Sequence, residues 1–199
     1  MRTNAGETRF AGVAALFAGT AWVAWAALNT RTHGGLDVGA AAVGERMSRV
    51  GALFMVGWNL LLIPAALVLY ATLVELHPHR VRLATTCGLA SLLFWAYGGA
   101  THGITPALEV SYLVLSAVWW FGIGATLWPT NKVFGGLTIA LGAFAFWDAL
   151  LTGLEPVPFA LYLTAAPKLP LSILWDFALG YVLVRRSAAP TTHLATSAI

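Results

Sequence analysis

The chain has 199 residues, of which 59% are hydrophobic and only 10% are Asp, Glu, Lys or Arg. A soluble domain usually carries about a quarter charged residues, so this composition excludes a protein with a fully solvated surface. The formal net charge of +3 comes from residues scattered between apolar blocks. Without a basic face, the sequence predicts no nucleic-acid partner.

The apolar residues form six blocks, most of them near the ~20 residues that cross a bilayer as a helix. We expect spans at residues 10–28, 50–74, 83–101, 108–128, 133–151 and 171–184. Pro64 should kink the second span, and residues 75–82 should form a water-facing turn. The sequence therefore predicts an all-α polytopic membrane bundle of six transmembrane helices, with residues 1–186 as one domain.

The sixth span is predicted to be irregular and Pro-broken at its start. Four prolines interrupt the sequence before it, at positions 156, 158, 167 and 170. Either this helix begins before Pro170 with a kink, or residues 157–166 form an interfacial helix that leads into it. Residues 187–199 are small and polar, which predicts a disordered cytoplasmic tail.

The distribution of lysine and arginine predicts the orientation of the spans. With six spans, one side holds Arg2, Arg9, Arg80, Arg82, Lys132, Arg185 and Arg186, and the other holds Arg31, Arg46, Arg49 and Lys168. Seven against four favours N- and C-termini that are both cytoplasmic. We expect a multi-pass protein of the cell inner (plasma) membrane.

An ionisable side chain inside a span is costly to bury and therefore indicates a functional site. Asp176 lies near the middle of the sixth span, Asp148 lies one turn inside the fifth, and Glu109 opens the fourth. These three are the candidate catalytic acids, with Asp176 first. Each has a structural alternative: Asp176 could fix helix packing through Asn59, a serine or a backbone carbonyl, Asp148 could lie near the surface, and Glu109 could stabilise a helix start.

Most of the nine tryptophans fall in the outer halves of the predicted spans or near mid-depth. A mixture of interfacial belt and core packing is one explanation, and an aromatic cavity that opens toward the outer leaflet is the other. The candidate ligand-binding residues are Trp58, Asn59, Trp95, His102, Tyr112, Trp119, Trp120, Trp147 and Trp175. His102 could equally be a solvated loop residue.

Several cofactors leave sequence marks that this chain lacks. Only His102 lies near a span as a possible haem ligand, and Lys132 and Lys168 lie at span edges, which disfavours a retinal Schiff base. No paired Glu-x-x-His pattern, phosphate loop or HExxH motif occurs. Cys87 is the single cysteine, so there is no intrachain disulfide. We expect no cofactor and no metal.

Three functions remain open. The first is a pocket for a lipophilic small molecule, isoprenoid- or lipid-like, in which a buried carboxylic acid acts as general acid and aromatic faces stabilise a cation. The likeness to integral-membrane terpene cyclases is one of architecture alone, and the activity would be that of a cyclase or isomerase. The second is a proton-coupled transporter, and the third an accessory subunit of a membrane complex. Membrane lipids and a second copy of the chain are possible partners.

Overall fold

The computed structural model describes residues 4–33, 49–101, 105–154, 161 and 163–188, with the backbone alone for residues 28–33, 49 and 50. It is all-helical over this part of the chain, with no strand. The α-helices are α1 (Ala5–His33), α3 (Arg49–Leu73), α4 (Pro78–Thr101), α5 (Pro106–Leu127), α6 (Lys132–Gly153) and α8 (Lys168–Ala188). A short 3-10 helix, η1 (Leu163–Ala165), precedes α8.

Each helix begins and ends where local chemistry allows. Pro78 and Pro106 stand at the first positions of α4 and α5, where a missing N–H costs no hydrogen bond. Thr105 caps α5 through Leu108 N–H, and Asn131 caps α6 through Phe134 N–H. The predicted turn at residues 75–82 is therefore shorter than expected, because α4 already begins at Pro78.

α8 begins at Lys168, before Pro170, which is where the first of the two alternatives placed its start. Pro170 falls in the first turn, where its missing N–H has no acceptor to lose. The second alternative placed a helix at residues 157–166, and most of that range lies outside the described residues. α8 has 21 residues and is therefore about 32 Å long, close to the thickness of a bilayer's hydrocarbon core.

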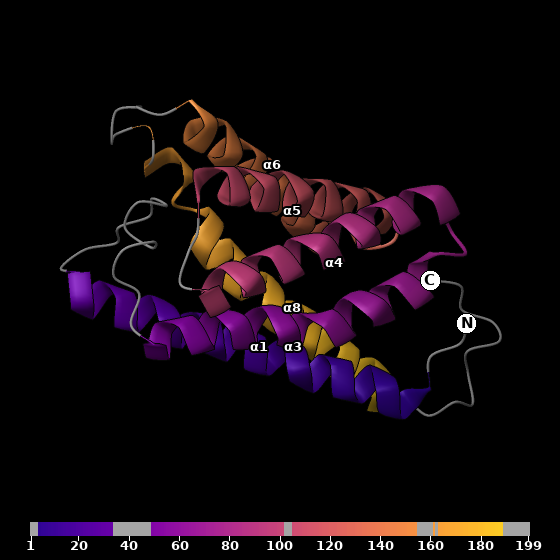
Figure 1. The fold of residues 1–199 in the computed structure, drawn as a ribbon. Coiled ribbons are helices and arrows are strands. Elements are labelled where there is room, and N and C mark those ends of the chain that lie inside the picture. Colours follow the sequence, from indigo (N-terminus) through magenta and orange to yellow (C-terminus); the bar gives the residue numbers. More distant parts are fainter. Residues whose placement is uncertain (1–3, 34–48, 102–104, 155–160, 162, 189–199) are drawn as a thin grey trace.

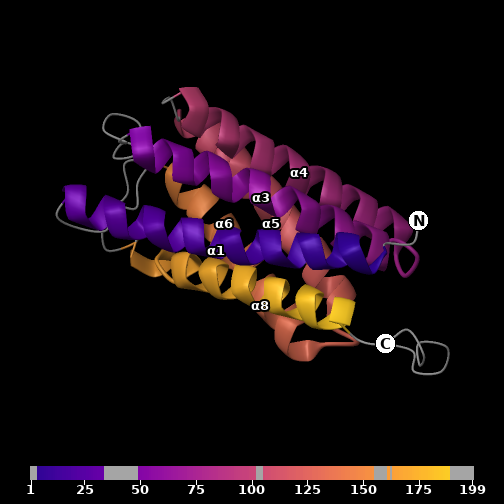
Figure 2. The ribbon, with the colours of Figure 1, turned by 90° about the horizontal axis from the view of Figure 1, so that it is seen from below.

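The six α-helices form a ring in which each contacts the next along the chain, and α8 closes it against α6 and α1. Figures 1 and 2 show the helices running roughly along one common axis, with the start of α1 and the end of α8 at the same end of the bundle. We call this the Arg186 end. We call the opposite end, where α6 ends and α8 begins, the Lys168 end.

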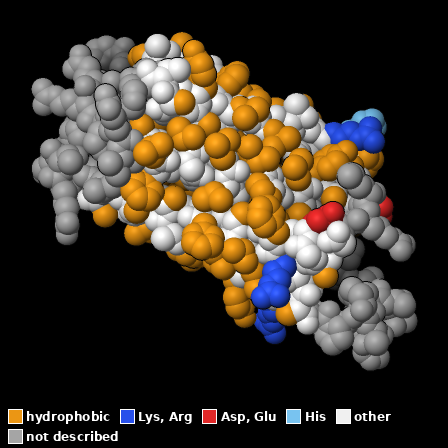
Figure 3. Space-filling model, turned by 60° about the horizontal axis from the view of Figure 1, so that its bottom comes forward, with side chains coloured by type: hydrophobic (Ala, Val, Ile, Leu, Met, Phe, Trp, Pro, Cys, Tyr) orange, Lys and Arg blue, Asp and Glu red, His pale blue; other side chains and the backbone are white. Residues whose placement is uncertain are grey.

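The outer surface of the ring is apolar. Phe17, Leu53, Leu83 and Tyr97 are each more than 60% exposed, which water would penalise and lipid would not. Figure 3 shows hydrophobic side chains over the flank of the bundle, with Lys, Arg, acidic and His side chains at one end. Five helices, α1 and α3 to α6, are long and apolar enough to cross a membrane, which indicates a multi-pass membrane protein.

α8 lies antiparallel to α1 over most of its length. Gly12 near the start of α1 faces Gly180 near the end of α8, and Trp22 bonds to Ser172 further along both helices. A Cβ on Gly12 would lie 2.8 Å from Val184 N and 2.9 Å from Gly180 O. The two backbones therefore approach closely, as small residues permit between helices in a bilayer. α8 brings its buried face, which includes Asp176, into the bundle.

Candidate functional site

Tyr112 on α5 is buried in the interior of the bundle, as the three candidate acids are. Glu109, Tyr112 and Ser116 lie on one face of α5. Glu109 on α5, Asp148 on α6 and Asp176 on α8 are buried as well, so three neighbouring helices contribute acidic side chains to this interior. We call Glu109, Tyr112, Asp148 and Asp176 the Tyr112 cluster.

The members of the Tyr112 cluster are all buried. Asp176 is 1% exposed, Tyr112 6%, Glu109 7% and Asp148 8%. A carboxyl group buried in an apolar region carries a large electrostatic cost unless its charge is paired or it holds a proton. Asp148 has a cation partner in Lys168, whereas Asp176 has only the neutral N–H group of Trp58 as a partner among the described residues.

Asp176 accepts a hydrogen bond from Trp58. The Trp58 Nε1–H group lies 2.8 Å from Asp176 Oδ2. The partner is thus a tryptophan of α3, rather than the asparagine, serine or backbone carbonyl that the sequence suggested. Asn59 instead donates from its amide to Met55 O on its own helix, 2.8 Å away, and its buried Oδ1 has no partner among the described residues.

A stack of three indoles holds Trp58 in place. Trp22 on α1 lies between Trp25 and Trp58, with ring centroids 4.4 and 4.7 Å apart and interplanar angles of 16° and 13°. Trp22 donates to Ser172 Oγ at 2.7 Å, one helical turn before Asp176. Two stacked indoles therefore donate to two polar side chains on one face of α8, and this fixes the rotation of α8 about its axis.

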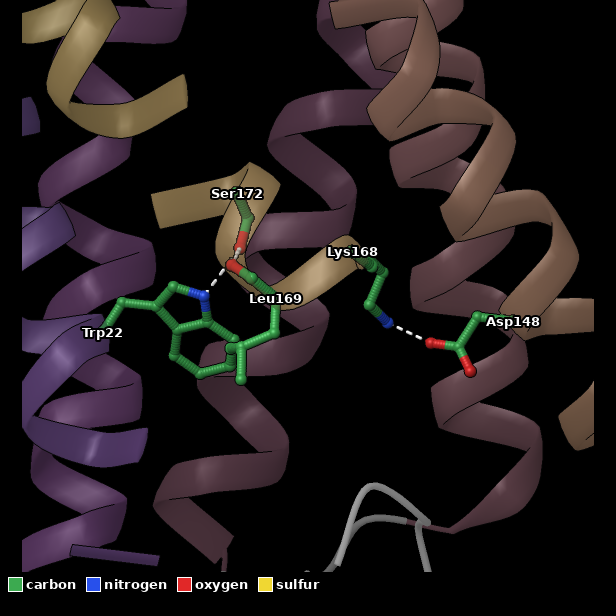
Figure 4. A network of polar contacts seen from close by, with 5 residues as sticks. All are labelled: Trp22, Asp148, Lys168, Leu169 and Ser172. Carbon is green, nitrogen blue, oxygen red and sulfur yellow. Dashed lines mark hydrogen bonds and ion pairs between the residues drawn. The ribbon is translucent and has the colours of Figure 1, made fainter. Parts of the chain in front are cut away.

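Asp148 pairs with Lys168, the first residue of α8. Figure 4 shows Lys168 reaching from α8 to Asp148 on α6, with the Trp22–Ser172 contact on the other side of the same helix. The neighbouring Trp147 is 40% exposed and donates to Thr164 Oγ1 of η1 at 2.6 Å. Asp148 thus connects the end of α6 to the start of α8, and Trp147 connects it to η1. Trp147 lies at the periphery of the bundle.

The remaining candidate aromatic residues form two groups. Trp95 on α4 stacks on Tyr112, with ring centroids 4.4 Å apart, and covers one face of the phenol. Trp119, Trp120 and Trp175 pack together with centroid distances of 5.6 to 6.4 Å, and Trp175 donates to Thr138 Oγ1 at 2.9 Å. The first group adjoins the Tyr112 cluster, while the second is a tightly packed part of the core.

Sequence reasoning did not single out Trp22, Thr138, Ser172 or Lys168 as site residues. Trp22 and Ser172 become site residues only because α8 packs on α1. No local sequence pattern predicts that packing. Lys168 carried a usable signal, because a lysine at one span edge and an aspartate at the adjacent span edge are natural partners. His102 lies outside the described residues. Among the described residues no group of three His, Cys, Asp or Glu is arranged to hold a metal ion.

No protein-family model, curated protein or solved structure matches this chain.

Proposed function

We propose that this chain is an integral membrane enzyme that binds a small lipophilic molecule, isoprenoid- or lipid-like, beside the Tyr112 cluster and protonates it. The reaction class is that of a cyclase or isomerase. The observation that supports the proposal is the burial of three carboxyl groups from three helices in the apolar interior, where Trp58 donates to Asp176 and Trp95 stacks on Tyr112.

Each residue of the cluster has a distinct task in this mechanism. Asp176 in its protonated form transfers its proton to an alkene carbon or an epoxide oxygen of the substrate. The resulting cation lies against the indole face of Trp58 or Trp95, whose ring quadrupole stabilises it. A carboxylate of the cluster, Glu109 or Asp148, then removes a proton from the cation, so that the net reaction consumes none. In this proposal the hydroxyl of Tyr112 relays the proton back to Asp176.

The experiment compares lipid extracts from cells that express the native chain or single variants. Asp176→Asn and Tyr112→Phe keep the size of the side chain and remove the acid or the hydroxyl. We expect both to abolish the formation of at least one lipophilic species seen by mass spectrometry with the native chain. Glu75→Gln is the matched control, because Glu75 is an exposed acid at the Arg186 end. Identical lipid extracts from cells with the native chain, Asp176→Asn and Tyr112→Phe would refute the proposed enzymatic activity.

A proton-coupled carrier is the second candidate. A hollow enters the bundle from the Arg186 end and is lined by Leu179 and Leu183. These residues follow Asp176 by three and seven positions, so they share its face of α8. The hollow thus approaches Asp176 from the side opposite to Lys168, which suits a carboxyl group that exchanges protons with both sides. In proteoliposomes, a carrier would acidify the lumen when its substrate is added, because protons enter together with the substrate. Asp176→Asn would abolish this acidification.

A further inference from the structure

The hollow at the Arg186 end lies on the axis of the bundle. Its lining comes from α3, α6, α8, the end of α5 and the turn that follows α5, and includes Leu69, Thr72, Asn131, Phe134, Leu183 and Arg186. α3 and α6 are not neighbours in the ring. A space that both of them line is therefore inside the ring and opens toward water at its end, rather than toward lipid at its side.

The hollow is apolar at depth and polar at its mouth. Arg186 lies seven residues after Leu179, which makes the hollow about 10 Å deep along α8. Leu69, Phe134 and Leu183 line the hollow and are buried. Phe134 in turn stacks on Trp175, with ring centroids 6.0 Å apart and an interplanar angle of 11°. Phe134 therefore connects the wall of the hollow to the aromatic core.

The mouth favours an anion. Arg186 is exposed and has no acidic partner within the part of the chain that the structure describes. Asn131 uses its side-chain oxygen to accept the N–H of Phe134, which leaves its amide N–H groups as donors. The described charges at this end are Arg9, Arg80, Arg82, Lys132, Arg185 and Arg186 against Glu7 and Glu75, or six positive against two negative. The local potential is positive.

The volume of the hollow limits the size of the occupant. It encloses about 120 Å³, similar to apolar cavities in other proteins that accept a benzene-sized molecule. We propose that this hollow is a binding site for a small organic anion that enters from the aqueous side. Its carboxylate pairs with Arg186 and the amide of Asn131, and its apolar body lies against Phe134, Leu69 and Leu183. This site is separate from the Tyr112 cluster.

The test uses 4-fluorobenzoate as the probe and the full chain in phosphatidylcholine nanodiscs. Binding is followed by the broadening of the ¹⁹F resonance. We expect Arg186→Gln to weaken binding about tenfold, because a charge-assisted pair is lost. Arg185→Gln is the matched control, since Arg185 is the adjacent exposed arginine and does not line the hollow. It should change the affinity less than about twofold, as expected for an exposed charge that makes no direct contact.

A second variant keeps every charge and fills the space. Thr72 is exposed at the mouth, so Thr72→Phe is compatible with folding and should block the probe. Equal weakening by Arg185→Gln and Arg186→Gln would overturn the site, and so would undiminished binding to Thr72→Phe. Displacement of the probe by inorganic phosphate or by phosphatidylglycerol, but not by benzoate, would also overturn the proposal. The hollow would then bind an inorganic ion or a lipid headgroup rather than a small organic anion. Asp176→Asn should bind the probe normally, which separates this result from the enzyme assay.

Discussion

Asp176 shows what a single residue reveals before its neighbours are known. An acid in the middle of an apolar block is costly to bury, and the sequence alone therefore identifies it as a residue with a special partner or task. The partner, Trp58, could not be predicted in the same way. An indole N–H can serve many acceptors, and its choice of Asp176 depends on how Trp22 stacks and how α8 is rotated.

The bond between Trp58 and Asp176 predicts a measurable coupling. Trp58→Phe keeps most of the ring and removes the donor, so it should lower the free energy of unfolding by about 1–3 kcal/mol. In the Asp176→Asn background the same change should cost clearly less, because the two residues share one interaction. Thermal denaturation of the four proteins of this cycle in detergent measures it. Strict additivity would contradict the bond.

The ion pair between Asp148 and Lys168 allows a structural role to be separated from a chemical one. Lys168→Gln leaves a mostly buried carboxylate without its cation and should lower the thermal stability. The charge exchange Asp148→Lys with Lys168→Asp should restore much of that stability. If Asp148 is also a base in the reaction, the exchange should leave the lipid product reduced. Recovery of both stability and product would assign Asp148 to structure alone.

At the scale of the element, the length of the apolar blocks predicted each of the six described α-helices, while the ends shifted by up to five residues. The observed ends differ from the predicted ones because capping residues, prolines and helix packing determine where a helix ends. The length of an apolar block contains no information on these features. α4 starts at Pro78 although its first residues are polar. α8 was the most difficult helix to predict, since its start depends on Lys168 reaching Asp148 of another helix. The close approach of α1 and α8 at Gly12 and Gly180 could also not be predicted from the sequence around either glycine.

That close approach predicts different results for two glycine substitutions. Gly12→Ala places a Cβ within 2.9 Å of backbone atoms of α8, so α1 and α8 must separate, at a cost of about 1–3 kcal/mol. Gly57→Ala is the control, because a Cβ there meets nothing within 4 Å. It should raise stability by up to about 1 kcal/mol through helix propensity. The order of the two melting temperatures checks the packing, and equal values would contradict it.

At the scale of the whole molecule, composition predicted a membrane bundle because too few charges are available to cover a water-soluble surface. Composition gives no sign of how the deep acids are arranged relative to one another. The burial of Asp176 depends on the closure of the ring by α8 against α1 and α6. α8 is not among the five helices that are apolar enough to span by composition, because it carries Lys168, Asp176, Arg185 and Arg186. Whether α8 forms the sixth span therefore decides whether Asp176 lies in the membrane interior.

Cysteine labelling in a Cys87→Ser background tests directly whether α8 crosses the membrane. Single cysteines replace Glu7 before the first span, Leu154 after α6, and Ala188 at the end of α8, all of them exposed positions. A membrane-impermeant maleimide is added to intact cells and to inside-out vesicles. If α8 crosses the membrane, positions 7 and 188 react from the same side, which we predict to be the cytoplasmic side, and position 154 reacts from the other. Labelling of positions 154 and 188 from one side would contradict the sixth span and remove Asp176 from the membrane interior.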